Sequence, residues 1–196
     1  FLYSSDKNIK AGALLALGLC NAGVRDPVEP ALGMLPQHLA EGSTSSMDER
    51  ACAALGLGVA YTCNPKTDIA DVLIPVVDGS GAPPASTPGA NEKSQMELKC
   101  VAALALGLVF VGTGNEAVTM ALMQRMMEAS PAELDMPVAR LLAAALALLF
   151  LGKQEACDAA LQVLQTVEHP LSKFAQALVS GCAYAGTGNA LEVQKL

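Results

Sequence analysis

The sequence contains few aromatic residues and no tryptophan. Aromatic side chains make up 4% of its 196 residues, whereas hydrophobic residues of all kinds make up 52%. A chain this apolar can bury a large core, which excludes an intrinsically disordered protein. Because large side chains are scarce, the core must be built from small residues, and this favours helices that pack closely against one another.

The sequence also contains few positively charged residues. Twelve Lys and Arg residues stand against 19 Asp and Glu residues, which gives a formal net charge of −7. An acidic surface repels nucleic-acid phosphates and anionic lipid head groups, so we expect no nucleic-acid partner and no membrane partner. The two long apolar runs, 101–111 and 141–151, are about half of the roughly 20 residues that a membrane-spanning helix needs. We therefore interpret them as buried helices.

Three further features bear on where the chain comes from. It has no initiator methionine and no signal-peptide pattern, and it stops inside a helical pattern, so we interpret it as a segment of a longer protein. Its cysteines form no CxxC pair and lie far apart, mostly in apolar segments, so we predict buried free thiols in a reducing compartment. The cysteines are Cys20, Cys52, Cys63, Cys100, Cys157 and Cys182.

An internal repeat supplies the main evidence on fold. A segment rich in Ala, Leu and Gly recurs five times, at 10–23, 49–63, 99–112, 139–152 and 173–186. The segments end at residues 23, 63, 112, 152 and 186, which are 40, 49, 40 and 34 residues apart. A second helix is predicted after each one, at 30–40, 68–77, 116–129, 155–168 and from 190 onward. Such helix hairpins must stack on their neighbours to bury their apolar faces.

The repeat predicts an all-α fold of stacked helix hairpins. The five units are expected at 1–40, 41–77, 96–129, 135–168 and 170–196. The long step between the second and third units comes from a segment rich in Gly, Pro and Ser, for which we predict a flexible surface loop at 78–95.

Glycines inside the first helix of each unit need an explanation, since each costs about 1 kcal/mol relative to alanine. We predict that they let adjacent helix backbones approach closely, so that packing offsets this cost. The predicted spacers are Gly18, Gly56, Gly58, Gly107 and Gly181. No strand pattern precedes them, so they do not form a nucleotide-binding GxGxxG loop.

The repeated segments resemble the proteasome/cyclosome repeat family. The resemblance rests on KAGALLALGLCNAGVRDPVEPALGML, LGLGVAY, LALGLVFVGTGN and CAYAGTGNALEVQKL. The family's repeats occur in two large non-ATPase subunits of the 26S proteasome base and in the largest subunit of the anaphase-promoting complex. Among these, the segments most resemble the base subunit that receives ubiquitin and shuttle factors. The resemblance implies a toroid of two concentric helix rings and a location in the cytoplasm and nucleus.

The residues offer little for catalysis. The two histidines, His38 and His169, lie near predicted helix ends without the partners that a hydrolytic triad or a metal site needs, so we interpret them as surface or capping residues. Acidic residues such as Asp48 and Glu49 lie at helix starts, where they favour the helix dipole. We therefore expect neither an enzyme nor a bound cofactor or metal.

A binding surface is predicted on the helix at 116–129. At 100° per residue, Val118, Leu122 and Met126 share one face and form the core stripe. A polar stripe lies on a different face, flanked by two methionines, and suits a partner with a small apolar patch ringed by basic residues, such as ubiquitin or a ubiquitin-like domain. The stripe is Ala117, Ala121, Gln124 and Glu128, and its flanks are Met120 and Met127.

The resemblance points to the same helix, because related subunits bind ubiquitin and ubiquitin-like domains of shuttle factors or a deubiquitinase through second helices. Glu128 matches an acid of the family motif, and Gln124 matches a position occupied by Asp or Gln. Where the motif has Gly-Asp, this chain has Glu116-Ala117, which displaces the carboxylate by one residue. The resemblance adds Glu97, with Asp71, Asp158 and Gln162 as border positions.

Other interpretations remain open at this point. The polar stripe is also compatible with a merely solvated helix face, with its methionines packed against adjacent repeats. A purely structural scaffold that docks neighbouring subunits or the proteasome ATPase ring would explain the repeat equally well. The chain is also compatible with the other large proteasome subunit or with the anaphase-promoting complex subunit.

Overall fold

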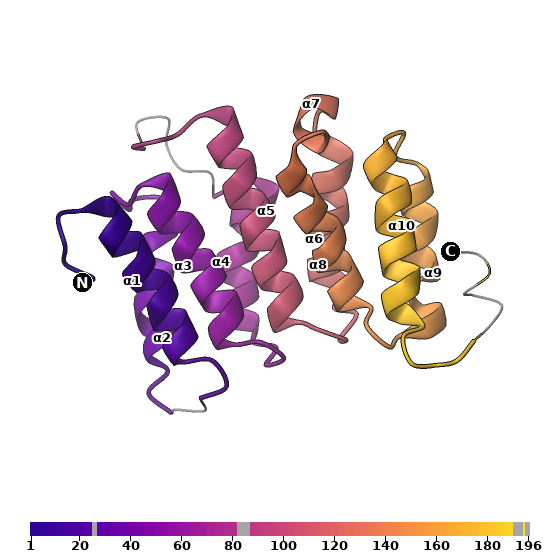
Figure 1. Cartoon of the computed structure of the whole chain (residues 1–196), viewed down its shortest axis with the longest axis horizontal. Helices are drawn as coiled ribbons and strands as arrows, with labels where there is room; N and C mark the ends of the chain where they lie inside the picture. The colour runs from indigo at the N-terminus through magenta and orange to yellow at the C-terminus, as the bar shows by residue number, and fades with distance from the viewer. Residues whose placement is uncertain (25–26, 82–86, 190–193, 195–196) are drawn as a thin grey trace.

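A computed structural model describes residues 1–24, 27–81, 87–189 and 194. The five helices that contain the Ala/Leu/Gly segments, called the long helices below, lie side by side in chain order along the longest axis of the molecule (Figure 1). They are α1 (Lys7–Cys20), α3 (Met47–Ala60), α5 (Glu92–Val109), α8 (Arg140–Leu149) and α10 (Pro170–Ala183). Helices α1 and α10 lie at opposite ends of this row.

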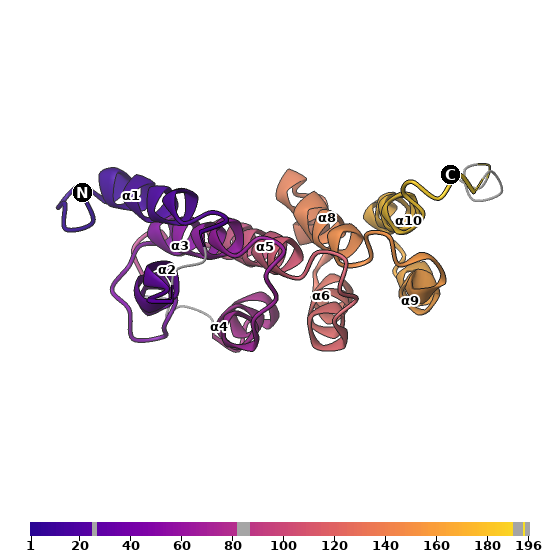
Figure 2. The same ribbon diagram turned by 90° about the horizontal axis from the view of Figure 1, so that it is seen from below.

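A second layer of helices covers one side of the row (Figure 2). It consists of α2 (Pro30–Met34), α4 (Thr67–Asp78), α6 (Glu116–Glu128) and α9 (Asp158–Gln165). Short connectors complete the chain: η1 (Pro36–His38), α7 (Pro131–Leu134), η2 (Pro137–Ala139) and η3 (Gln154–Cys157). The described residues contain no strand, so the predicted all-α fold of stacked helix hairpins is confirmed.

Small side chains and glycines bring the long helices into backbone contact. A Cβ atom added at Gly18 would overlap the backbone of Gly56 in the next long helix. One added at Gly58 would lie 2.6 Å from Cα of Ala105, a distance that real Cβ atoms do not reach.

The same relation recurs further along the row. A Cβ atom added at Gly107 would lie 2.7 Å from Cα of Ala145. The spacer prediction is thus confirmed at the first three long-helix interfaces. It is wrong for Gly181, where an added Cβ would meet nothing within 4 Å, because α10 is the last long helix of the described row.

Main-chain hydrogen bonds between successive units recur at equivalent positions along the row. The residue in left-handed conformation just after a long helix donates its N–H to a carbonyl of the next long helix, from Cys63 to Leu108 and from Gly112 to Leu148, both at 2.9 Å. Gly152 donates in the same way to the carbonyl oxygen of Cys182 at 3.0 Å. The backbone therefore fixes the spacing of successive units.

Several predicted boundaries differ from the structure. The second helix expected at 30–40 ends at Met34 and continues as η1, because Pro36 cannot donate a helical hydrogen bond. The helix expected at 155–168 begins as η3 and becomes α-helical only from Asp158 to Gln165. The helix expected from 190 onward falls largely outside the described residues.

The predicted loop at 78–95 is too long at its C-terminal end, where α5 begins at Glu92. Asn91 caps this helix: its side chain accepts from the N–H of Ser94 at 2.7 Å, and the Ser94 hydroxyl accepts from the N–H of Asn91 at 3.0 Å. This capping box starts the helix inside a polar stretch that composition alone assigns to a loop. Residues 82–86, in the middle of the predicted loop, lie outside the described residues.

No helix in the described ranges combines the length and the hydropathy that crossing a bilayer would demand.

Candidate functional site

Helix α6 is held by an apolar stripe that turns its opposite side outward. Val118, Leu122 and Met126 are buried in the core, as the helical periodicity predicts. Asn115 caps the helix by accepting from the N–H of Val118 at 3.1 Å. These contacts fix the rotation of α6 about its own axis and therefore decide which side chains face solvent.

The solvent-facing residues of α6 form the surface that we call the α6 face. Met120 and Met127 are 68% and 59% exposed, although large apolar side chains are usually buried. Between them, the amide of Gln124 donates to a carboxylate oxygen of Glu128 at 2.7 Å. The α6 face comprises Glu116, Ala117, Met120, Gln124, Met127 and Glu128, all exposed.

One expected member of this surface is buried. Ala121 is only 7% exposed, because its position on the helix turns it toward the core side of the stripe. The expectation that it contributes contact area is therefore corrected, and the surface narrows to the six exposed residues.

The border residues lie at different distances from α6 in the fold. Asp71 is exposed on α4 and Asp158 and Gln162 are exposed on α9, and these helices flank α6 in the same layer (Figure 2). Glu97 lies instead on α5, in the layer of long helices, where it pairs with Lys93 at 3.7 Å. The predicted border residues thus come from two layers: Asp71, Asp158 and Gln162 from the second layer and Glu97 from the layer that contains α5.

A buried arginine joins α6 to the short helix α7, and neither feature was predicted from the sequence. The guanidinium of Arg125 donates to the Glu133 carboxylate at 2.8 Å and lies 3.7 Å from the sulfur of Met96. Burial alone would raise the pKa of Glu133, but the Ser130 N–H and the Arg125 charge outweigh it and hold that pKa below its ordinary value. The S-P-x-E pattern from Ser130 to Glu133 is a capping signal that could have revealed α7.

A groove opens where the N-terminal part of α5 meets α7 and η2, and we call it the α5–α7 groove. Its volume is about 440 Å³. Three carboxylates and one lysine line it together with apolar side chains from the α7–η2 segment. The charged residues are Glu92, Lys93, Glu97 and Glu133, and the apolar ones are Ala132, Met136, Pro137 and Val138.

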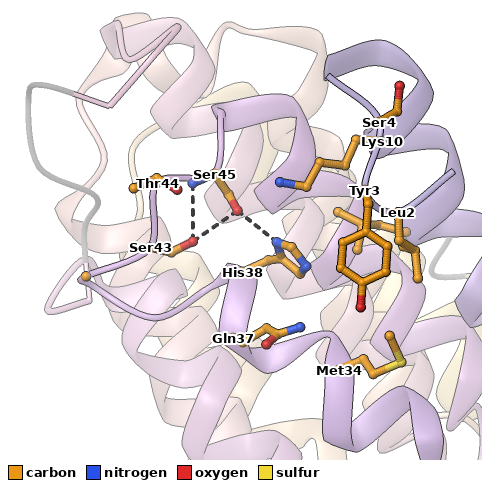
Figure 3. A pocket seen from close by; sticks show the side chains of 12 residues that line it. Leu2, Tyr3, Ser4, Lys10, Met34, Gln37, His38, Ser43, Thr44 and Ser45 are labelled. Atoms are coloured by element: carbon orange, nitrogen blue, oxygen red, sulfur yellow. Dashed lines mark hydrogen bonds between the residues drawn. The ribbon is translucent and has the colours of Figure 1, made fainter. Parts of the chain in front are cut away.

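A second pocket, of about 490 Å³, holds His38 (Figure 3). The imidazole Nδ1 lies 2.8 Å from the hydroxyl of Ser45, which also accepts from the Ser43 hydroxyl at 3.0 Å. Burial, and then the nearby Lys10 ammonium, lower the pKa of His38, which favours its neutral form. His38 is half-buried at the end of η1, where its imidazole hydrogen-bonds to the connector that follows, so the prediction of a surface or capping residue is met only in part.

The other histidine behaves as predicted. Nδ1 of His169 accepts from the N–H of Leu171 at 3.1 Å and so caps α10, while Nε2 lies 3.3 Å from the Asp135 carboxylate.

None of the six cysteines, all of which lie among the described residues, forms a disulfide bond, as predicted, but they are not uniformly buried. Cys20 and Cys63 are exposed, because each lies at or just after the end of a long helix. Cys100 and Cys157 are buried. Within the described ranges, no three His, Cys, Asp or Glu side chains are grouped closely enough to hold a metal ion.

Comparison with known proteins places this geometry in a family. Residues 101–131, which span the second half of α5, all of α6 and the start of α7, match the model of the proteasome/cyclosome repeat. This match places residues 101–131 in the proteasome/cyclosome repeat family, and the chain as a whole is similar to a part of proteasome regulatory subunits.

The similarity to particular proteins covers the whole chain. The chain is 42% identical to the 26S proteasome regulatory subunit rpn1 of Schizosaccharomyces pombe over 196 residues. It is 35% identical to the 26S proteasome non-ATPase regulatory subunit 2 of Dictyostelium discoideum, also over 196 residues. It is 30% identical to the 26S proteasome regulatory subunit RPN2 of Eremothecium gossypii over 98% of its length. The chain spans 20% of the length of the first two relatives.

Proposed function

We propose that this chain is the part of a proteasome regulatory subunit that binds ubiquitin, or a ubiquitin-like domain, through the α6 face. The observation that carries the proposal is the exposure of Met120 and Met127 on either side of the Gln124–Glu128 pair. Flexible thioethers beside carboxylates suit a partner with a small apolar patch surrounded by basic side chains. The protein would act without catalysis, in the cytoplasm and nucleus, in ubiquitin-dependent degradation.

Affinity for a single ubiquitin should be modest, because one helix face buries little area. A chain of linked ubiquitins would gain affinity through its high effective concentration at neighbouring second-layer helices. Asp71 on α4 and Asp158 and Gln162 on α9 border the α6 face on its two sides and are candidates for these additional contacts.

The test is a titration of isotope-labelled ubiquitin with the 196-residue chain, followed by NMR. Wild type should shift ubiquitin resonances, and the double variant Gln124→Arg with Glu128→Arg should abolish the shifts by placing two cations against a basic partner. The matched control, Asn8→Arg with Glu41→Arg, changes exposed residues outside the α6 face by the same charge and should bind like wild type.

A thermal melt separates binding from folding. Gln124 and Glu128 are exposed, so the free energy of unfolding of the double variant should differ from that of wild type by about 0.5 kcal/mol or less. A variant that unfolds would support a structural role of the stripe, and a folded variant that still binds ubiquitin would remove the α6 face from the proposal.

A second candidate function is a scaffold that docks neighbouring subunits or the ATPase ring of the proteasome. The backbone-to-backbone packing of the long helices favours it, because such close contacts give a stiff support. Under this alternative the wild-type chain would leave the ubiquitin spectrum unchanged while still binding an isolated ATPase-ring subunit in the same assay.

A further inference from the structure

The α5–α7 groove has apolar walls that the rest of the described chain leaves uncovered. Ala132 and Pro137 are exposed, and Met136 and Val138 are half-buried. Its volume of about 440 Å³ lies within the range of roughly 300–1,000 Å³ that is usual for binding sites. The groove is therefore large enough to take one long side chain and part of the backbone that carries it.

The charges around this groove are unbalanced. Both oxygens of Glu133 are engaged, one by Arg125 and the other by the N–H of Ser130, each at 2.8 Å. Glu92 is exposed, and Glu97 has only an exposed lysine, Lys93, at 3.7 Å. Such an exposed pair is weak and exchanges easily for a better partner. Glu92 and Glu97 therefore leave negative charge available at the rim.

An arginine side chain complements this arrangement. Its aliphatic stem can lie on the apolar wall formed by Ala132, Pro137 and Val138 while its guanidinium reaches the carboxylates of Glu92 and Glu97. The planar guanidinium presents several donors in a fixed fork and pairs with carboxylates through two parallel hydrogen bonds, which a lysine ammonium cannot do. The groove thus favours an arginine flanked by apolar residues.

The groove continues the α6 face along the chain. Helix α6 ends at Glu128, and Ser130, two residues later, already lines the groove. The Arg125–Glu133 ion pair holds α7 against α6. A partner seated on the α6 face would therefore have the groove beside it, at the C-terminal end of the helix.

We propose that the α5–α7 groove binds an extended, arginine-bearing apolar segment of the same partner that docks on the α6 face. The identity of that partner rests on the proposed function above, whereas the chemistry of the groove does not depend on it.

The groove can be tested with short peptides on the 196-residue chain. The probe is the acetylated, amidated pentapeptide LRLRL, and the two matched controls carry citrulline or glutamate in place of arginine. Methyl resonances of Ala132, Met136 and Val138 should shift with the arginine peptide. Citrulline has nearly the same shape without the charge, so equal shifts with the citrulline or glutamate peptide, or no shift with any peptide, would overturn the proposal.

Variants of the rim sharpen this test. Glu92→Gln with Glu97→Gln should weaken binding of the arginine peptide by about fivefold or more, because both carboxylates are lost. The control Glu41→Gln with Asp68→Asn changes the net charge equally at exposed positions outside the groove and should bind the peptide like wild type. Equal weakening by both pairs would mean that only overall charge matters, which contradicts a specific groove.

Ubiquitin titration into the same rim variant links the groove to the α6 face. A weaker ubiquitin affinity than that of the Glu41→Gln, Asp68→Asn control supports a shared partner, and an unchanged affinity contradicts it. If wild type does not bind ubiquitin at all, the proposed function fails, while the peptide experiment still decides whether the groove binds arginine.

Discussion

Single glycines decide how closely the long helices of this chain pack. Gly12 and Gly18 lie in the same helix, α1, but in opposite surroundings. An added Cβ would meet nothing within 4 Å at Gly12 and would overlap the Gly56 backbone at Gly18. The two positions therefore separate the intrinsic helix propensity of glycine from its role in packing.

We expect Gly12→Ala to stabilise the chain by about 0.5–1 kcal/mol, because alanine is the better helix former. Gly18→Ala should destabilise it by about 1–3 kcal/mol, because α1 and α3 must move apart. Urea unfolding of the two variants beside wild type measures both effects. Equal effects at the two sites would contradict the spacer role of Gly18.

Buried thiols give the chain a sensitivity to alkaline pH. Burial raises the pKa of Cys100 to about 12, whereas a free cysteine has a pKa of about 8.5. Between these values the unfolded chain releases this proton while the folded chain keeps it, so Cys100 makes the folded state less stable as pH rises.

Each pH unit in this window should cost about 1.4 kcal/mol of unfolding free energy. We therefore expect wild type to lose about 2 kcal/mol more than Cys100→Ala between pH 8 and pH 10. Urea unfolding at both pH values gives the comparison, which cancels the contributions of other titrating groups. Parallel losses in the two proteins would show that Cys100 is not the group responsible.

At the scale of elements, the connector between α2 and α3 depends on a buried arginine. The guanidinium of Arg50 is almost fully buried and donates to four main-chain carbonyls at 3.1–3.4 Å. These carbonyls belong to Leu39, Ala40, Ser43 and Ser45. The Arg50 side chain thus supplies hydrogen-bond donors to connector carbonyls that have no partner in regular secondary structure.

Arg50→Met should destabilise the chain by about 3 kcal/mol or more, because several carbonyls lose their donor in a buried place. The matched control is Arg140→Met. The Arg140 guanidinium lies over the Phe174 ring at 5.8 Å, a contact worth about 1 kcal/mol or less at the surface. Thermal melts of both variants measure the difference, and equal melting temperatures would refute the bracing role of Arg50.

The sequence predicted the long elements well and the short ones poorly. The Ala/Leu/Gly pattern recurs often enough to identify the repeat, and periodicity correctly placed Val118, Leu122 and Met126 in the core. Helix α7 has only four residues, which is too short for periodicity to register. The groove beside it depends on α5 and η2 meeting in space, which no local pattern encodes.

At the scale of the whole molecule, the chain is a row in which each long helix packs mainly on the long helices before and after it. Stability in such an array is approximately a sum of unit and nearest-neighbour contributions. A substitution that weakens an interface at the end of the row should therefore destabilise only the terminal helix. One that weakens an interface in the middle should destabilise the helices on both sides.

Hydrogen exchange can show this difference. Gly18→Ala should speed amide exchange in α1 and leave α10 unchanged, because four helix–helix interfaces lie between α1 and α10. Gly107→Ala, at the α5–α8 interface, should speed exchange on both sides of that interface. Faster exchange throughout the chain in both variants would instead indicate one indivisible cooperative unit.

The main-chain bonds between successive units, from Cys63 to Leu108, from Gly112 to Leu148 and from Gly152 to Cys182, have an evolutionary consequence. Every residue type except proline supplies both a backbone N–H and a carbonyl, so side-chain substitutions on the solvent side leave these hydrogen bonds in place. The pitch of the array can persist while its exterior diverges. Exposed residues can therefore change, and with them the partner that the surface binds, while the arrangement of the helices stays the same.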